Sequence, residues 1–284
     1  MAYGSPERVE DIRPYLEDIR EGRPVSDAAV EELTERYRRI GGRSPLDEVT
    51  ERQRAALERE LGLPVYVGMK HWRPRIADAV EAALRGGAER IVGIVLAPHF
   101  SALSIAGYRE RLELALAGRA ELRFVESWYD HEPFLDVLAG RVRGTDAHVV
   151  FTAHSLPERI LAMGDPYRDQ LLETSRLVAE RAGLEHWSFA FQSASATGEP
   201  WLAPDILEEL DDLHARGVRK VLVCPIGFVS DHLEILWDID VEARERAAEL
   251  DLELDRIESL NDDPAFVRAL AELVRQALRV PSAA

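Results

Sequence analysis

Short apolar runs alternate with amphipathic helical stretches along the whole chain, and this order constrains the fold more than any other feature. The apolar runs are rich in Val, Ile and Phe, as expected of strands buried on both faces. They cover residues 64–69, 91–98, 122–126, 147–153, 187–192, 220–225 and 252–257. Helical periodicity covers residues 27–40, 76–84, 133–142, 167–181, 203–214 and 264–278. This order predicts parallel sheets with helices on both faces.

A weak internal duplication divides the chain into two halves. The segment AYGSP at 2–6 resembles AHSLP at 153–157, and PHFS at 98–101 corresponds to PIGFVS at 225–230. Each segment except the first follows a predicted strand, so we also expect a strand before Ala2. Because ligands of open α/β sheets bind at the carboxyl ends of strands, the four loops predict a cleft between two facing halves.

Composition excludes several classes of protein. The formal net charge of −17, from 35 Lys and Arg against 52 Asp and Glu, argues against a nucleic-acid binder. The single cysteine, Cys224, excludes an internal disulfide and an iron–sulfur cluster. We expect a cytoplasmic protein without a transmembrane segment. Lys70 and Lys220 are the only lysines, which codon bias or a hot habitat would explain.

Three carboxylates follow the predicted strand 220–225 at intervals of four residues. Glu234, Asp238 and Glu242 would stack on one face of an α-helix over about 12 Å. Like charges at this spacing repel, so the row needs a cation, basic partners or water. A solvated helix face and a metal-handling row both fit.

His154 ends the predicted strand 147–153, where it is either a hydrogen-bonded loop residue or a metal ligand. If His154 faces Glu234 across the cleft, the pair offers one nitrogen and one oxygen to a weakly held divalent ion. The same pair could accept protons. The basic cluster at 36–43, with Arg20, is either an anion site or a solvated helix end.

Seven motifs together resemble the signature of the ferrochelatase family. They are MAYGSP at 1–6, IGGRSPL at 40–46, LAPHFS at 96–101, AHSLP at 153–157, GDPY at 164–167, QS at 192–193 with PWLAPD at 200–205, and PIGFVSDHLE at 225–234. Their order and spacing fit over essentially the whole chain. Tyr3 and the PHFS motif resemble the branch from Gram-positive bacteria, the coproporphyrin ferrochelatases.

The resemblance implies an α/β fold of two Rossmann-like, chelatase-type halves, residues 1–143 and 144–262, with the active-site cleft between them. A C-terminal helix at 263–284 is expected to pack back on the first half. The implied reaction inserts ferrous iron into coproporphyrin III, giving coproheme and two protons, in haem biosynthesis. The alternatives are a protoporphyrin IX ferrochelatase, a sirohydrochlorin or cobalt chelatase, and a non-catalytic haem or metal carrier.

The resemblance also implies roles for individual residues. His154 and Glu234 become the catalytic and metal-site pair, and Asp238 and Glu242 continue the row along which metal arrives. The residues expected to contact the porphyrin are Tyr3, Arg20, Arg36, Tyr37, Ser44, His99, Tyr129 and Trp201.

The expected partners are the two substrates, ferrous iron and the porphyrin. No tightly bound cofactor is implied, although an auxiliary divalent cation near Asp238 and Glu242 fits the acidic row. We expect a monomer that makes transient contacts with other haem-pathway enzymes.

Overall fold

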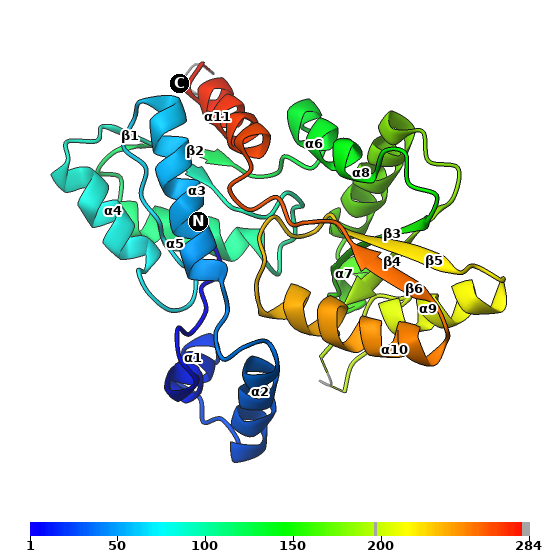
Figure 1. The fold of residues 1–284 in the computed structure, drawn as a ribbon. Helices are drawn as coiled ribbons and strands as arrows, with labels where there is room; N and C mark the ends of the chain where they lie inside the picture. Colours follow the sequence, from blue (N-terminus) through cyan, green and yellow to red (C-terminus); the bar gives the residue numbers. More distant parts are fainter. Residues whose placement is uncertain (196–197, 280–284) are drawn as a thin grey trace.

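The computed structural model describes residues 1–195 and 198–279, and it confirms an α/β fold with two parallel sheets flanked by helices (Figure 1). The strands are β1 (Arg90–Ile94), β2 (Glu121–Val125), β3 (His148–His154), β4 (Trp187–Gln192), β5 (Lys220–Pro225) and β6 (Glu253–Arg256). The helices are η1 (Val9–Asp11), α1 (Ile12–Ile19), α2 (Asp27–Arg39), α3 (Leu46–Leu61), α4 (Ile76–Arg85), α5 (Ile105–Leu116), α6 (Glu132–Val142), α7 (Arg159–Ala162), α8 (Tyr167–Ala182), α9 (Ile206–Ala215), the π-helix η2 (Ile235–Ala243), α10 (Arg244–Glu249) and α11 (Pro264–Arg279).

The second sheet has the order β4-β3-β5-β6, and each strand is parallel to its neighbours. Val149 and Phe151 of β3 pack into a core with α6 and α8, whereas Val150 packs into a core with α9 and η2. Both faces of β3 are therefore buried. This explains the unbroken apolar run that predicted the strand.

The first sheet contains β1 and β2, paired in parallel from Arg90↔Glu121 to Ile94↔Val125. The strand predicted at 64–69 is wrong, because this segment forms only isolated bridges at Met69. An apolar run becomes a strand only where a neighbouring backbone supplies hydrogen bonds. Here Met1–Tyr3 supplies them at the Met69 end alone.

The six helices predicted from periodicity are confirmed, with ends that differ by up to three residues. Sequence reasoning missed α3 and α5, although Ile105, Tyr108, Leu112 and Leu116 of α5 follow helical spacing and are buried. The row after Ser230 was expected to be α-helical. Its first part is instead the π-helix η2, which α10 continues.

The last described helix, α11, returns to the first half of the chain. It packs on α3 and α6 and also contacts β1 and β2. Residues 280–284 of the helix predicted at 263–284 lie outside the described residues. Over residues 1–195 and 198–279, no helix combines the length and apolarity needed to cross a bilayer.

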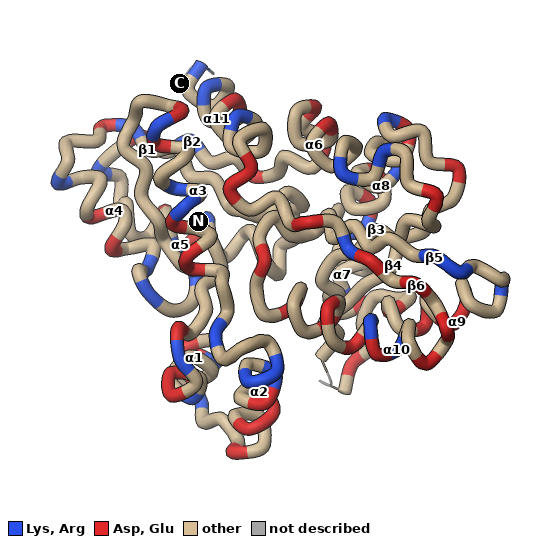
Figure 2. The backbone as a smooth tube through the Cα atoms, in the orientation of Figure 1, with Lys and Arg blue, Asp and Glu red and all other residues tan. Residues whose placement is uncertain are grey.

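Helices α1 and α2 project from the body of the molecule at one end (Figure 1). At its C-terminal end, α2 reaches the second half of the chain, where Arg39 forms a 2.5 Å ion pair with Glu245 of α10. Acidic and basic residues are interspersed along the outer helices (Figure 2), in pairs such as Arg36–Glu32 and Arg176–Glu173. Exposed pairs of this kind contribute little to stability individually.

Gly227 allows the loop after β5 to lie directly against β3. Its backbone N–H donates to the Thr152 carbonyl at 3.1 Å. A Cβ at this position would lie 2.5 Å from Ala153 Cβ and 2.9 Å from Ala153 Cα. The residue after Ala153 is His154, so this close approach sets the distance between the two loops that follow β3 and β5.

We predict that Gly227→Ala lowers the free energy of unfolding by about 1–3 kcal/mol, because the added methyl overlaps the β3 backbone. Urea denaturation measures this change. Gly140→Ala is the matched control: its Cβ meets no atom within 4 Å inside α6, and alanine favours a helix interior by up to ~1 kcal/mol. Equal stability of the two variants would contradict the packing argument.

Candidate active site

His154 stands at the carboxyl end of β3 with one ring nitrogen already engaged. Its Nδ1 donates to the Ser155 carbonyl, and the Tyr167 hydroxyl donates to the His154 carbonyl at 2.9 Å. These bonds hold the ring and leave Nε2 available. The side chain is 31% exposed, so Nε2 has room for an external partner.

Glu234 lies between two imidazoles, in the short helical segment directly before η2. Its Oε1 is 3.6 Å from His154 Nε2, and its Oε2 is 3.6 Å from His232 Nε2. Like His154, His232 directs its Nδ1 at a backbone carbonyl, that of Ser230, at 3.0 Å. Both Nε2 atoms therefore point at a single carboxylate.

Glu234 is ionised at neutral pH. Burial opposes its ionisation, but the neighbouring His154, His232 and Arg36 outweigh burial and lower the pKa of Glu234 to about 2. Burial likewise opposes protonation of His232, yet its contact with Glu234 raises the His232 pKa above the usual value. The site thus holds a stable negative charge between groups that can bind protons.

Asp238 and Glu242 continue the acidic row along η2. Asp238 is 5% exposed and accepts hydrogen bonds from Ser193 and Gln192. Burial and the Glu234 charge raise the pKa of Asp238 to about 7, and burial also raises the pKa of Glu242. Four residues are slightly less than one turn of a π-helix and slightly more than one α-helical turn. The row therefore survives the change of helix type.

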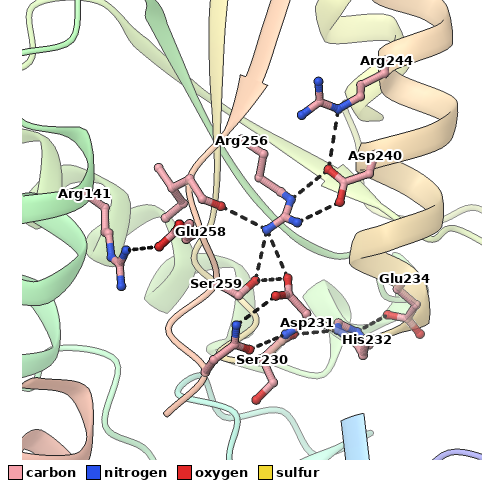
Figure 3. A network of polar contacts seen from close by, with 12 residues as sticks. Arg141, Ser230, Asp231, His232, Glu234, Asp240, Arg244, Arg256, Glu258 and Ser259 are labelled. Carbon is pink, nitrogen blue, oxygen red and sulfur yellow. Dashed lines mark hydrogen bonds and ion pairs between the residues drawn. The ribbon is translucent and has the colours of Figure 1, made fainter. Parts of the chain in front are cut away.

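Arg256, whose side chain is largely buried, connects the segment around Glu234 to β6 (Figure 3). Arg256 of β6 donates to Asp240 of η2 at 3.0 and 2.8 Å and lies 3.2 Å from Asp231. Asp231 also accepts hydrogen bonds from Ser259 and Asn261, at 2.7 and 2.9 Å. The residues on both sides of Glu234 are therefore held by one cation.

Residues from the first half approach the same carboxylate. The Tyr3 ring lies 4.8 Å from His71, and burial together with the Glu234 charge raises the Tyr3 pKa to about 12. Tyr3 is nevertheless 42% exposed, so its phenol stays neutral and accessible. Arg36 lies 5.5 Å from the centre of the Trp237 ring, close enough to lower the pKa of Glu234.

The remaining predicted porphyrin contacts lie in different places. The Trp201 ring is 6.3 Å from His154. His99 is 3% exposed and hydrogen-bonds with Thr174, which donates to the Tyr129 carbonyl. The others are Tyr37 and Ser44, which are buried, and Arg20, which is exposed at the end of α1.

Sequence reasoning missed three groups near this site. His232 stands two residues before Glu234, within the quoted motif. Lys70 Nζ and Arg111 Nη1 both lie close to Gly107, within 4 Å of the position that a Cβ would take there. Lys70 donates to the Ser104 carbonyl, and over the described part of the chain neither side chain forms an ion pair. Burial and the Arg111 charge lower the pKa of Lys70 to about 8. The sequence feature that could have identified Lys70 as a candidate is the rarity of lysine, since Lys70 is one of two lysines in an arginine-rich chain.

Over residues 1–195 and 198–279, no group of three or more His, Cys, Asp or Glu side chains is arranged to enclose a metal ion. The approach of His154 Nε2 and Glu234 Oε1 offers two ligand atoms and an open remainder. Structural metal sites are closed by four ligands, whereas an open site can exchange its ion. This geometry suits an ion that is delivered and passed on.

Comparison with known proteins shows which protein family this chain resembles. A profile described as ferrochelatase matches residues 1–278. A protein of Deinococcus radiodurans named ferrochelatase is 45% identical, over 97% of this chain and 94% of its own length. The ferrochelatase of Herpetosiphon aurantiacus is 43% identical, over 96% of each chain. The coproporphyrin III ferrochelatase of Halalkalibacterium halodurans is 41% identical, over 98% of this chain and 96% of its own length.

Solved structures with a similar fold include SirB from Bacillus subtilis with Fe³⁺. It has a TM-score of 0.63 at 13% identity and covers 82% of this chain and 89% of that one. The sirohydrochlorin chelatase SirB from the subspecies spizizenii, in complex with cobalt, has a TM-score of 0.59 at 15% identity, over 81% and 89% of the chains. At these identities the likeness concerns the fold alone.

We predict that Arg256→Gln lowers the free energy of unfolding by about 1–3 kcal/mol, because Asp231 and Asp240, each about a quarter exposed, lose their largely buried counterion. Urea unfolding of the purified variants measures the loss. Arg244→Gln is the matched control: Arg244 is 46% exposed and 3.7 Å from Asp240, so we expect less than ~1 kcal/mol. A loss of similar size in both variants would show that the network does not depend on Arg256.

Proposed function

This chain belongs to the ferrochelatase family, and we propose that it inserts ferrous iron into coproporphyrin III with release of two protons. The single observation that carries the proposal is the approach of His154 Nε2 to Glu234 Oε1 at 3.6 Å. These atoms come from motifs that resemble the family signature, and they offer ligands of the types that first-row divalent ions bind. Iron is a substrate in this proposal and leaves with the product.

Glu234 and His154 have different roles at the metal. A carboxylate with a pKa of about 2 remains charged and attracts the cation. The same low pKa makes Glu234 a weak proton acceptor. His154 leaves Nε2 free for the ion or for a proton, so we assign the metal to both residues and the proton uptake to His154.

Asp238 is suited to accept a proton that the porphyrin releases. Two pyrrole protons must leave for each ion inserted, and an effective base has a pKa near the working pH. Asp238 has a pKa of about 7 and lies in the same acidic row as Glu234. We propose that protons leave toward Asp238 and that Asp238 and Glu242 bring cations in, with an auxiliary divalent ion bound there.

Two arguments favour coproporphyrin III as the substrate, namely the number of its propionates and the name of a relative. This porphyrin carries four propionates and protoporphyrin IX carries two, so it needs more cationic partners. Arg20 and Arg36 are two candidates. Arg111, whose charge acts on Tyr3, and the neighbouring Lys70 add two more cations that form no ion pair with any described residue. The Halalkalibacterium halodurans relative named for coproporphyrin III supports the same choice.

Two other activities give different outcomes in the same assay. A protoporphyrin IX ferrochelatase would use the same site and prefer the other porphyrin. A haem or metal carrier would bind product tightly without consuming iron and porphyrin together.

We predict that this chain metallates coproporphyrin III in preference to protoporphyrin IX in anaerobic Fe²⁺-insertion assays. His154→Ala should lower the rate by a factor of about 10²–10⁴ or more, since it removes a ligand and a base. His186→Ala is the control, because His186 is exposed and remote from Glu234 in the fold. Near-normal turnover by His154→Ala would refute the site, and preference for protoporphyrin IX would refute the substrate.

We predict that Arg111→Ala raises the KM for coproporphyrin III about tenfold and leaves kcat within a few-fold, because one charged hydrogen bond to a propionate is lost. Steady-state insertion kinetics separate the two constants. Arg109→Ala is the matched control on the same helix, since Arg109 already pairs with Glu113 and Glu126. If both variants behave alike, Arg111 does not bind the substrate.

A further inference from the structure

The only asparagine of the chain, Asn261, lies in the turn between β6 and α11. Its φ of +44° is in the left-handed region, which asparagine adopts more readily than most residues that carry a side chain. Its backbone N–H donates to the Val229 carbonyl at 2.8 Å, and its backbone carbonyl accepts from Gln53 Nε2 at 2.8 Å. Asn261 therefore connects the turn before α11 to the loop after β5 and to α3.

The side chain of Asn261 makes a two-point contact with Asp231. Asn261 Oδ1 accepts from the Asp231 backbone N–H at 2.9 Å, and Asn261 Nδ2 donates to Asp231 Oδ2 at 2.9 Å. An amide carries an acceptor and a donor on one rigid group, which this contact requires. An aspartate at position 261 would keep the first bond but would place a second carboxylate against Asp231.

Gln53 extends this contact to the first half of the chain. It lies on α3 and is 2% exposed, and its Nε2 donates to the Asn261 carbonyl at 2.8 Å and to Ser230 Oγ at 3.0 Å. The carbonyl of the same Ser230 faces His232 Nδ1 at 3.0 Å (Figure 3). Ser230 and Asp231, the two residues directly before His232, are therefore both bonded to groups outside their own loop.

Glu234 lies two residues further along the same segment. Its Oε2 is 3.6 Å from His232 Nε2, and its Oε1 is 3.6 Å from His154 Nε2. A displacement of residues 230–231 would reach both contacts, because only a short stretch of chain lies between. Misplacing a reacting group by about 1 Å can lower a rate about 10²-fold. The position of the Glu234 carboxylate therefore depends in part on an amide from a different segment.

We propose that Asn261 is a positioning residue of the metal site, which holds residues 230–232 so that Glu234 stays within reach of His154. Its role in catalysis rests on the proposed function. Asn261 acts through Asp231 and the chain that follows it, not by contact with a substrate. Metal affinity and iron kinetics should therefore respond to a change of this residue, whereas porphyrin binding should not.

A reciprocal exchange of the two side chains tests the proposal. Asn261→Asp sets two carboxylates against each other. Adding Asp231→Asn again places one amide opposite one carboxylate and restores the total charge. In coproporphyrin III metallation we expect Asn261→Asp to lower kcat/KM for Fe²⁺ about 10–100-fold and to leave the porphyrin KM within about twofold. The double variant should return to within about fivefold of the unaltered chain, because the two changes compensate.

Asp262→Asn is the matched control for the loss of a charge in this turn. Asp262 directly follows Asn261, is 40% exposed and pairs with Arg52, itself 44% exposed, at 3.1 Å. Its kinetic constants should stay within about twofold of those of the unaltered chain. Unaltered iron kinetics in Asn261→Asp would overturn the proposal. A loss that Asp231→Asn does not reverse would also overturn it, because repulsion between the two carboxylates would then not be the cause.

A second variant covers poor folding of Asn261→Asp. Asn261→Gly keeps the left-handed turn and both backbone hydrogen bonds and removes only the amide. Calorimetric titration with Zn²⁺ in the absence of porphyrin should show an affinity about tenfold weaker than that of the unaltered chain. Equal Zn²⁺ affinity of the two proteins overturns the proposal. If the unaltered chain metallates neither porphyrin but Asn261→Gly weakens Zn²⁺ binding, the proposed function fails and the positioning role stands.

Discussion

The parallel pairing of β3 with β5 is the constraint on which the rest of the site depends. Parallel neighbours end at the same edge of a sheet, so the loops that follow them emerge together. His154 closes one strand and Glu234 follows the other, although 80 positions separate them in the sequence. Gly227 brings the second loop into contact with Ala153, because no side chain stands between them. The site is thus a consequence of sheet topology and one missing methyl group.

The carboxylates around Glu234 have different neighbours, and these neighbours decide what each carboxylate can do. Glu234 faces two imidazoles and stays ionised. Asp231 and Asp240 share Arg256, which compensates both charges. Asp238 accepts hydrogen bonds from the neutral side chains of Gln192 and Ser193, and burial together with the Glu234 charge raises its pKa to about 7. One stretch of chain therefore supplies a fixed charge and a titratable group side by side, which suits the binding of a cation coupled to the release of protons.

Periodicity predicted much of the fold because burial on both faces leaves a clear apolar signal, as in β4 and β5. It failed at 64–69, where the residues favour a strand but the neighbouring backbone is present only near Met69. The pairing of His154 with Glu234 was predictable, since each follows an apolar strand. The cationic pair of Lys70 and Arg111 was not, because 41 positions separate these residues and only tertiary structure shows that neither forms an ion pair with a described acidic residue.

The two halves of the chain place side chains of different chemistry at corresponding positions. Tyr3 and His154 both follow an alanine that pairs with a parallel neighbour, Met69 in one half and Phe191 in the other. Burial raises the Tyr3 pKa to about 12, so this side presents a neutral phenol near neutral pH. The other side presents an imidazole and a carboxylate that stays charged. Because proton-binding groups gather on one side, a substrate held between Tyr3 and Glu234 would meet its cation and lose its protons on the same face.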